Sequence, residues 1–146
     1  MSHTATIKAI KIMDIAALGA AVTELASMGI KISLVPDSTP RAYSVGQKGM
    51  GKADYVISIP DAKYDVGLYK QPDGSYEPRT DFFMGSVAKV LGTSHVVKGR
   101  EEQAQLGKLL QFYGLHAASR AATQQGKSVR RVAGKDGAIA LEIVGY

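Results

Sequence analysis

The amino-acid sequence predicts an α+β fold, ferredoxin-like in character, in which a mostly antiparallel sheet carries two main helices on one face. Residues 54–80 alternate apolar and polar side chains in three runs separated by turn residues, which is typical of an antiparallel meander. Residues 14–28 and 100–125 instead repeat apolar side chains every three or four positions, as amphipathic helices do. The apolar face of the meander must be buried, and the two amphipathic helices can bury it. We therefore expect a single domain over residues 1–146.

The chain begins with a predicted strand and helix. Residues 4–12 are rich in β-branched side chains and predict a strand. Asp14 is a suitable N-cap, and the helix should end at Met28 because Gly29 can adopt the left-handed conformation. Residues 30–34 alternate apolar and polar side chains, which predicts a second strand. Strand, helix and strand in so short a span favour a right-handed parallel crossover.

The middle of the chain predicts the meander itself. Residues 36–51 are irregular because prolines and glycines interrupt them, although a short strand over residues 41–45 is expected. Three strands should follow over residues 54–59, 64–69 and 75–80, joined by turns that contain proline, aspartate and glycine.

The last third predicts a helix and a hairpin. Residues 81–99 contain an apolar cluster that indicates a short helix or an ordered loop. The longest predicted helix covers residues 100–125, with Gly126 as its cap. Alternating residues over 129–132 and 139–143 flank a Gly-Lys-Asp-Gly turn and predict a closing hairpin.

Composition excludes several classes of function. The chain has no cysteine, which rules out disulfides, thiolate nucleophiles and cysteine-ligated metals. No basic and apolar leader opens the sequence, and no apolar run approaches the ~20 residues that cross a bilayer, so we expect a cytoplasmic protein without a membrane partner. The net charge of +5 permits a nucleic-acid partner without requiring one.

The histidines do not predict a metal site or any cofactor. His3, His95 and His116 lie far apart in sequence, and none has the paired spacing that places two ligands on one helix face. His116 follows an apolar stripe by one turn, which favours a half-buried histidine hydrogen-bonded to the sheet. No serine lies in a nucleophile elbow, and we expect no catalytic residues.

A run of basic residues near the end of the long helix is the first candidate binding site. No acidic residue interrupts residues 120–135, so these side chains could form a patch for phosphates. Its members are Arg120, Lys127, Arg130, Arg131 and Lys135. Strand alternation places Arg130 and Arg131 on opposite faces, which weakens the patch. Five tyrosines could stack on bases if they are exposed on the sheet: Tyr43, Tyr55, Tyr64, Tyr69 and Tyr76.

A glycine-rich segment is the second candidate. Gly46, Lys48, Gly49 and Gly51 could hold a phosphate, because glycines let backbone amides approach an anion and the lysine neutralises it. The spacing matches neither the dinucleotide fingerprint nor the P-loop, and no clear helix follows. A surface loop is therefore the favoured interpretation.

Four short motifs, taken in order, resemble a known family. They are Ser2-His3-Thr4, the pair Tyr64-Asp65-Val66-Gly67 and Pro72-Asp73-Gly74-Ser75-Tyr76, and Gln111-Phe112-Tyr113. Together they resemble the family named for hypothetical chloroplast reading frame thirty-five, a domain of unknown function found in cyanobacteria, red-algal plastids and bacteriophages. Residues 46–51 and 81–99 depart from its shorter versions. In cyanobacteria such genes lie near a ferredoxin and an AAA-class ATPase, so the resemblance implies an accessory role and transfers no catalytic residue.

These observations predict a non-enzymatic accessory or regulatory binding protein that acts on a protein partner. A homo-oligomer formed through a paired sheet edge or face would suit this role. Two alternatives remain open at this point. One is nucleic-acid binding through residues 120–135, and the other is a phage protein, in the host cytoplasm, that binds a nucleotide through residues 46–51.

Overall fold

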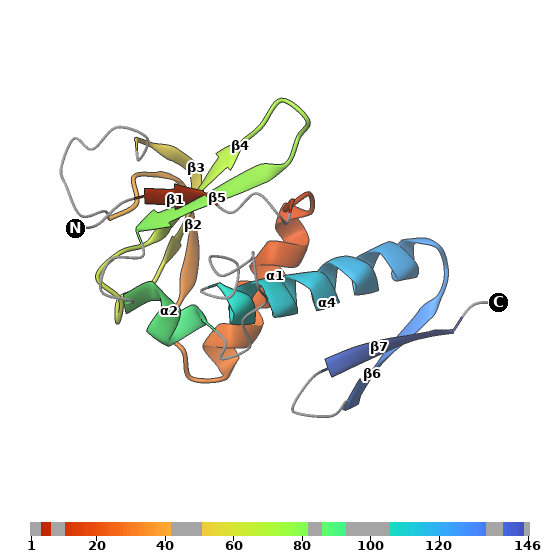
Figure 1. The fold of residues 1–146 in the computed structure, drawn as a ribbon. Coiled ribbons are helices and arrows are strands. Elements are labelled where there is room, and N and C mark those ends of the chain that lie inside the picture. The colour runs from red at the N-terminus through yellow and green to blue at the C-terminus, as the bar shows by residue number, and fades with distance from the viewer. Residues whose placement is uncertain are drawn as a thin grey trace.

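The computed structural model describes residues 4–6, 11–41, 51–81, 86–92, 106–133 and 139–144. Among these residues lie a five-stranded antiparallel sheet, three helices and a separate two-stranded hairpin (Figure 1). The expected strand over residues 41–45 falls outside the described residues except for its first residue, Arg41, which has no strand structure. The expected helix start at residues 100–105 also lies outside them.

The main sheet has the strand order β1-β5-β4-β3-β2, and every neighbouring pair is antiparallel. Its strands are β1 (Thr4–Thr6), β2 (Ser33–Ser38), β3 (Ala53–Ser58), β4 (Val66–Lys70) and β5 (Tyr76–Asp81). The last three form the predicted meander, which is confirmed. The element order opens β-α-β-β as ferredoxin-like folds do, and then adds two further antiparallel strands before the next helix.

The predicted crossover is parallel, because four successive antiparallel pairings leave β1 and β2 running in the same direction, but it does not join neighbouring strands. β1 and β2 lie at opposite edges of the sheet, with the whole meander between them. β1 pairs with β5, so that Thr4 lies opposite Asp81, and Ile12 forms only an isolated bridge with Tyr76. β1 pairs antiparallel with β5 and β2 pairs antiparallel with β3, because the meander has a free edge on each side.

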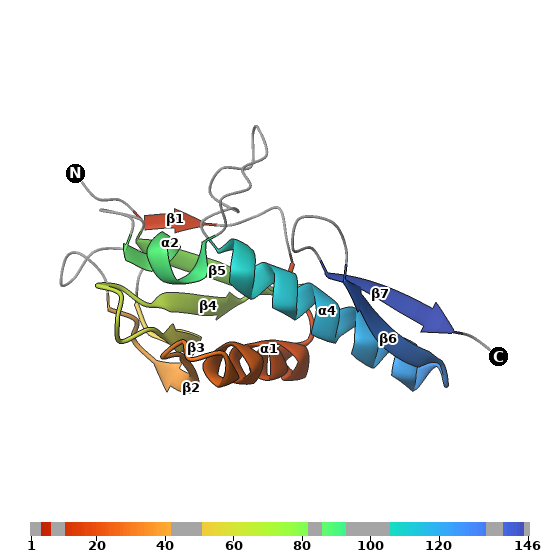
Figure 2. The same cartoon turned by 90° about the horizontal axis from the view of Figure 1, so that it is seen from below.

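The helices lie on one face of the sheet, as the sequence predicts (Figure 2). They are α1 (Ile15–Ser27), the short α2 (Ser86–Leu91) and α4 (Gly107–Gln124). The Asp14 carboxylate caps α1 by accepting a hydrogen bond of 3.1 Å from the backbone N–H of Ala17. Gly29 and Gly126 follow the two long helices with positive φ angles of 93° and 77°, which confirms both predicted ends.

The core lies between the sheet and the two long helices. Leu18 and Leu25 of α1 and Leu109 of α4 are completely buried against Ile57 and Leu68 of the meander. Each such side chain contributes roughly 1.5–3 kcal/mol when it is fully buried. The apolar faces of the two long helices and of the meander therefore bury one another in a single core.

The predicted hairpin is confirmed, but it stands apart from the main sheet. Strands β6 (Ser128–Ala133) and β7 (Ile139–Val144) form a two-stranded antiparallel sheet beyond the end of α4 (Figure 1). Leu141 packs against the core, while the rest of the hairpin projects away from the main sheet. Within the described ranges, no helix has the length and apolar character that a membrane span requires.

Candidate functional site

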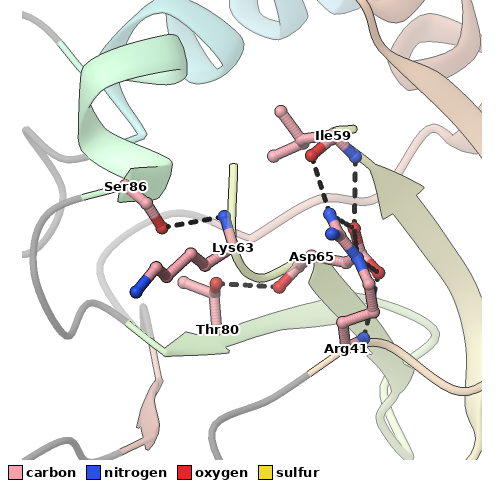
Figure 3. Close-up of polar contacts among 6 residues, drawn as sticks. All are labelled: Arg41, Ile59, Lys63, Asp65, Thr80 and Ser86. Atoms are coloured by element: carbon pink, nitrogen blue, oxygen red, sulfur yellow. Dashed lines mark hydrogen bonds and ion pairs between the residues drawn. The ribbon is translucent and has the colours of Figure 1, made fainter. Parts of the chain in front are cut away.

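The most buried charge among the described residues is Asp65, directly before β4, which binds Arg41 (Figure 3). Asp65 is only 4% exposed, and its Oδ1 atom lies 2.8 Å from Arg41 Nη2. The backbone N–H groups of Arg41 and Ile59 donate to the same carboxylate over 2.9 and 3.2 Å. Arg41 Nη2 also donates to the carbonyl oxygen of Ile59 over 2.7 Å. The carboxylate therefore joins the segment after β2 to the end of β3.

The electrostatics of this pair are those of a structural contact. Burial opposes ionisation of Asp65, but hydrogen bonds from Arg41 outweigh it and hold the pKa of the carboxyl below its usual value. The same hydrogen bonds raise the pKa of Arg41. Thr80 Oγ1 donates to the Asp65 carbonyl over 2.8 Å, so the backbone is held as well. A carboxylate saturated by internal donors has no free oxygen with which to take up a substrate proton.

A second network joins Glu24 of α1, His116 of α4 and Arg131 of β6. Glu24 Oε1 lies 2.7 Å from His116 Nε2. Arg131 donates to both Glu24 oxygens, with Nη1 at 2.6 Å from Oε2 and Nη2 at 2.8 Å from Oε1. The hydrogen bonds from Arg131, aided by those from His116 and opposed by burial, lower the pKa of Glu24 to about 2. This network fastens the hairpin to both long helices.

Each of the three arginines in the predicted basic patch binds a carboxylate of the same chain. Arg120 Nε lies 2.8 Å from Asp14 Oδ2, and Arg130 Nη2 lies 2.6 Å from Glu142 Oε2. Arg131 binds Glu24 on the opposite face of β6 from Arg130, as strand alternation predicts. Lys127 is exposed and forms no ion pair with any residue that the structure describes. Lys135 lies outside the described residues.

The four tyrosines of the predicted set that the structure describes do not form an exposed stacking platform. Tyr64 is buried, and the half-buried Tyr55 and Tyr76 pack edge to face with their ring centroids 5.5 Å apart. The Arg79 guanidinium covers Tyr69 at 4.5 Å from the ring centroid, and the Tyr69 hydroxyl donates to the Gly51 carbonyl over 2.7 Å. Tyr43 lies outside the described residues. Within the described chain, the base-stacking surface expected of a sheet-based RNA binder is missing.

The other predicted sites fall mostly outside the described chain. Of the glycine-rich segment, Gly46, Lys48 and Gly49 are not described, and Gly51 serves as the acceptor for Tyr69. His3 and His95 are likewise not described. Over the described ranges, no three histidine, aspartate or glutamate side chains gather closely enough to hold a metal ion.

The hairpin is the feature whose role the sequence analysis missed. Its outer face carries Arg130, Val132 and Glu142, because these residues alternate with Arg131 and Leu141, which face the helices. Val132 on this outer face is 40% exposed, whereas Ile143, which is 49% exposed, lies on the same face of the hairpin as Leu141. One signal was present in the sequence: Arg131 shares a strand face with Val129, so β6 lacks the uniform apolar face of a strand inside a covered sheet.

Fold and contacts together define a small α+β protein in which two helices cover an antiparallel sheet and a hairpin projects from its last helix. No protein-family model, curated protein or solved structure matches the chain. The resemblance to the hypothetical chloroplast reading frame family therefore stays a prediction.

Proposed function

We propose that this chain is a non-enzymatic accessory or regulatory protein that binds a protein partner through the outer face of the β6–β7 hairpin. The observation that carries the proposal is the position of that hairpin outside the main sheet, with Val132 exposed on its outer face. A two-stranded hairpin is marginally stable on its own, and here one face rests on the helices. The other face is free to gain apolar contacts from a partner.

The chemistry of the outer face suits a protein partner. Val132 offers an apolar centre, and the exposed ion pair of Arg130 with Glu142 lies beside it on the same face. Protein interfaces commonly combine an apolar centre with a polar rim in this way. The ion pair is balanced in charge, which favours a partner surface of mixed character over a polyanion.

Three carboxylates that bind arginines also support binding over catalysis. Asp14, Glu24 and Asp65 each bind an arginine, and each of these pairs joins two segments of the fold. All three carboxylates have pKa values below their usual range. Groups held in this state stabilise the fold and are poor proton acceptors at neutral pH.

The nucleic-acid alternative receives less support, since Arg120, Arg130 and Arg131 are all paired with acids. Binding that depended on phosphate contacts would weaken steeply as salt rises. The nucleotide alternative depends on residues 46–51, which are not described apart from Gly51. A thermal-shift panel of nucleotides tests it, because a ligand at a hundredfold excess over its Kd stabilises by about 2.7 kcal/mol.

The proposal is tested by affinity capture from nuclease-treated extract of the source cells. The baits are the wild-type protein, Val132→Lys on the outer hairpin face, and Ala26→Lys, which adds the same charge to the exposed surface of α1. We expect the wild type and Ala26→Lys to retain the same proteins and Val132→Lys to lose them. Equal retention by all three baits would place the contact elsewhere. Capture seen only without nuclease would favour the nucleic-acid alternative.

A further inference from the structure

We propose that two copies of this chain associate through strand β7, so that their hairpins join into one continuous antiparallel sheet with Leu141 opposite its counterpart. An exposed strand edge carries unpaired N–H and C=O groups that readily pair with another strand. Among the described strands, neither β6 nor β7 has a second neighbour. The inference goes beyond the proposed function, which uses the outer face of the hairpin, and neither depends on the other.

The edges of the main sheet are poorly suited to such pairing. The described part of β1 contains three residues, which offer few hydrogen bonds. β2 contains Pro36, which has no N–H to donate, followed by Asp37 with a positive φ angle of 55°. Both features are common protections of an edge strand. The hairpin has no such protection within its described strands.

Symmetry and charge then distinguish β6 from β7. When a strand pairs antiparallel with its own copy, the twofold axis runs perpendicular to the sheet, and residues on the same face lie opposite each other. The middle residues of β6 are Arg130 and Arg131, so a twofold axis near the centre of this strand places one of these arginines opposite the same arginine of the second copy. Like charges directly opposite each other are destabilising. A symmetric β6 pairing is therefore disfavoured in both registers.

The same reasoning selects one register for β7, whose sequence is Ile-Ala-Leu-Glu-Ile-Val. A centre at Glu142 would place two carboxylates opposite each other, whereas a centre at Leu141 places two leucines there. In the second register Glu142 lies opposite residue 140, an alanine, and keeps its own ion pair with Arg130. The exposed Ile143 gains an apolar neighbour in residue 139 of the second copy, which is an isoleucine.

The occupant of this edge is a second copy because a copy supplies the matching register and the matching apolar residues. Leu141 already packs against the core of its own chain, so pairing through β7 extends an ordered strand and costs little ordering of the backbone. The only charged residue of β7 is Glu142, and Arg130 neutralises it within the same hairpin.

The first test uses size-exclusion chromatography with light scattering over a wide range of protein concentration. Ile143→Lys places a lysine on the proposed contact strand, and Val132→Lys places the same charge on the neighbouring strand at similar exposure. We expect the wild type and Val132→Lys to have twice the mass of the chain and Ile143→Lys to have the mass of a monomer. A monomeric wild type at every concentration, or equal mass for both variants, would overturn the proposal. Circular dichroism establishes that each variant is folded.

The second test uses the absence of cysteine from the natural sequence. Under mild oxidation, Leu141→Cys should form a covalent dimer, because residues directly opposite each other in a sheet have Cβ atoms within ~5.5 Å, close to the span of a disulfide. Val132→Cys should stay uncrosslinked at the same protein concentration. Crosslinking of Val132→Cys alone would overturn the register. Failure of the proposed function is separately visible, since Val132→Lys is expected to lose its partner proteins and remain a dimer.

Discussion

Several hydrogen bonds converge on Asp65. Its carboxylate accepts from the side chain and backbone of Arg41 and from the backbone of Ile59, while its carbonyl accepts from Thr80 (Figure 3). A buried carboxylate without these donors would be strongly destabilising. Asp65 thus serves the fold by joining the segment after β2 to β3 and β5.

Replacing Asp65 with alanine should lower the free energy of unfolding by about 3 kcal/mol, because several buried donors lose their acceptor. Urea denaturation followed by circular dichroism measures the change. Asp61→Ala is the matched control, since Asp61 is exposed and its nearest lysine nitrogen is 3.9 Å away. The control should change stability by less than ~0.5 kcal/mol. Equal losses for the two variants would contradict a special role for Asp65.

Gly67 is a second residue with a specific packing requirement. A Cβ atom at this position would lie 2.8 Å from Cε2 of Tyr69 and 3.0 Å from Cγ of Pro40. Gly67→Ala should therefore cost roughly 1–3 kcal/mol through overpacking. Gly19→Ala in α1 provides the opposite case, because its Cβ would meet only Leu34 Cδ2 at 4.0 Å. The Gly19 variant should gain about 0.5–1 kcal/mol from helix propensity, and thermal unfolding compares the two directly.

At the scale of the elements, α1 and α4 are joined by a buried tyrosine. The Tyr113 hydroxyl accepts hydrogen bonds from the backbone N–H groups of Met13 and Asp14, over 2.9 and 3.2 Å. These N–H groups precede the first turn of α1, where no helical acceptor exists for them. Tyr113 therefore sets where α1 begins relative to α4.

Tyr113→Phe keeps the buried ring and removes only the acceptor. We expect it to lower the unfolding free energy by about 1–3 kcal/mol, because two N–H groups lose their partner. Thr123→Ala on the same helix removes an exposed hydroxyl that bonds to Ser119 and should have an effect below ~0.5 kcal/mol. Chemical denaturation measures the unfolding free energies of both variants and of the wild type. A Tyr113→Phe protein as stable as wild type would show that water replaces the hydroxyl.

The elements also show what sequence patterns can predict. α1 and the meander are predicted well because their signals are local: Asp14 caps the helix, Gly29 ends it, and alternating residues form each strand. The second strand is misplaced because Ile30 belongs to the helix cap, where its N–H donates to Leu25 over 3.3 Å and the N–H of Gly29 donates to Ala26 over 3.1 Å. Strand β2 consequently starts at Ser33.

Contacts between distant residues could not be predicted in this way. Arg131 and Glu24 are 107 positions apart, and Arg41 and Asp65 are 24 apart, so no spacing rule brings them together. The basic run at residues 120–135 therefore resembles an anion-binding patch in the sequence, while its arginines at 120, 130 and 131 serve as internal ion-pair partners in the fold.

For the molecule as a whole, Glu24 links three elements, since His116 lies on α4 and Arg131 on β6. Its pKa is lowered from an ordinary 4.5 to about 2. A carboxyl whose pKa falls on folding adds stability that is complete above about pH 4.5 and disappears as the pH falls towards 2. The hairpin should therefore loosen in acid.

Glu24→Gln should reduce the loss of stability between pH 4.5 and pH 2 by about 2 kcal/mol, after allowance for partial exposure of the network to solvent. Unfolding free energies measured at several pH values over this range provide the test. Asp61→Gln serves as the control, because Asp61 is exposed and lies outside this network. Identical pH profiles for Glu24→Gln and wild type would show that Glu24 titrates normally in the folded protein.

The placement of β1 has a consequence for how the chain acquires its structure on the ribosome. Thr4 is made 77 residues before its ladder partner Asp81, so β1 cannot pair until the whole meander has emerged. Closing so long a loop carries an entropic cost that the ladder recovers only late, and such distant pairing slows folding. Nascent chains arrested before β5 has emerged from the ribosome should therefore remain sensitive to proteases around β1, while chains that expose all of β5 should become resistant.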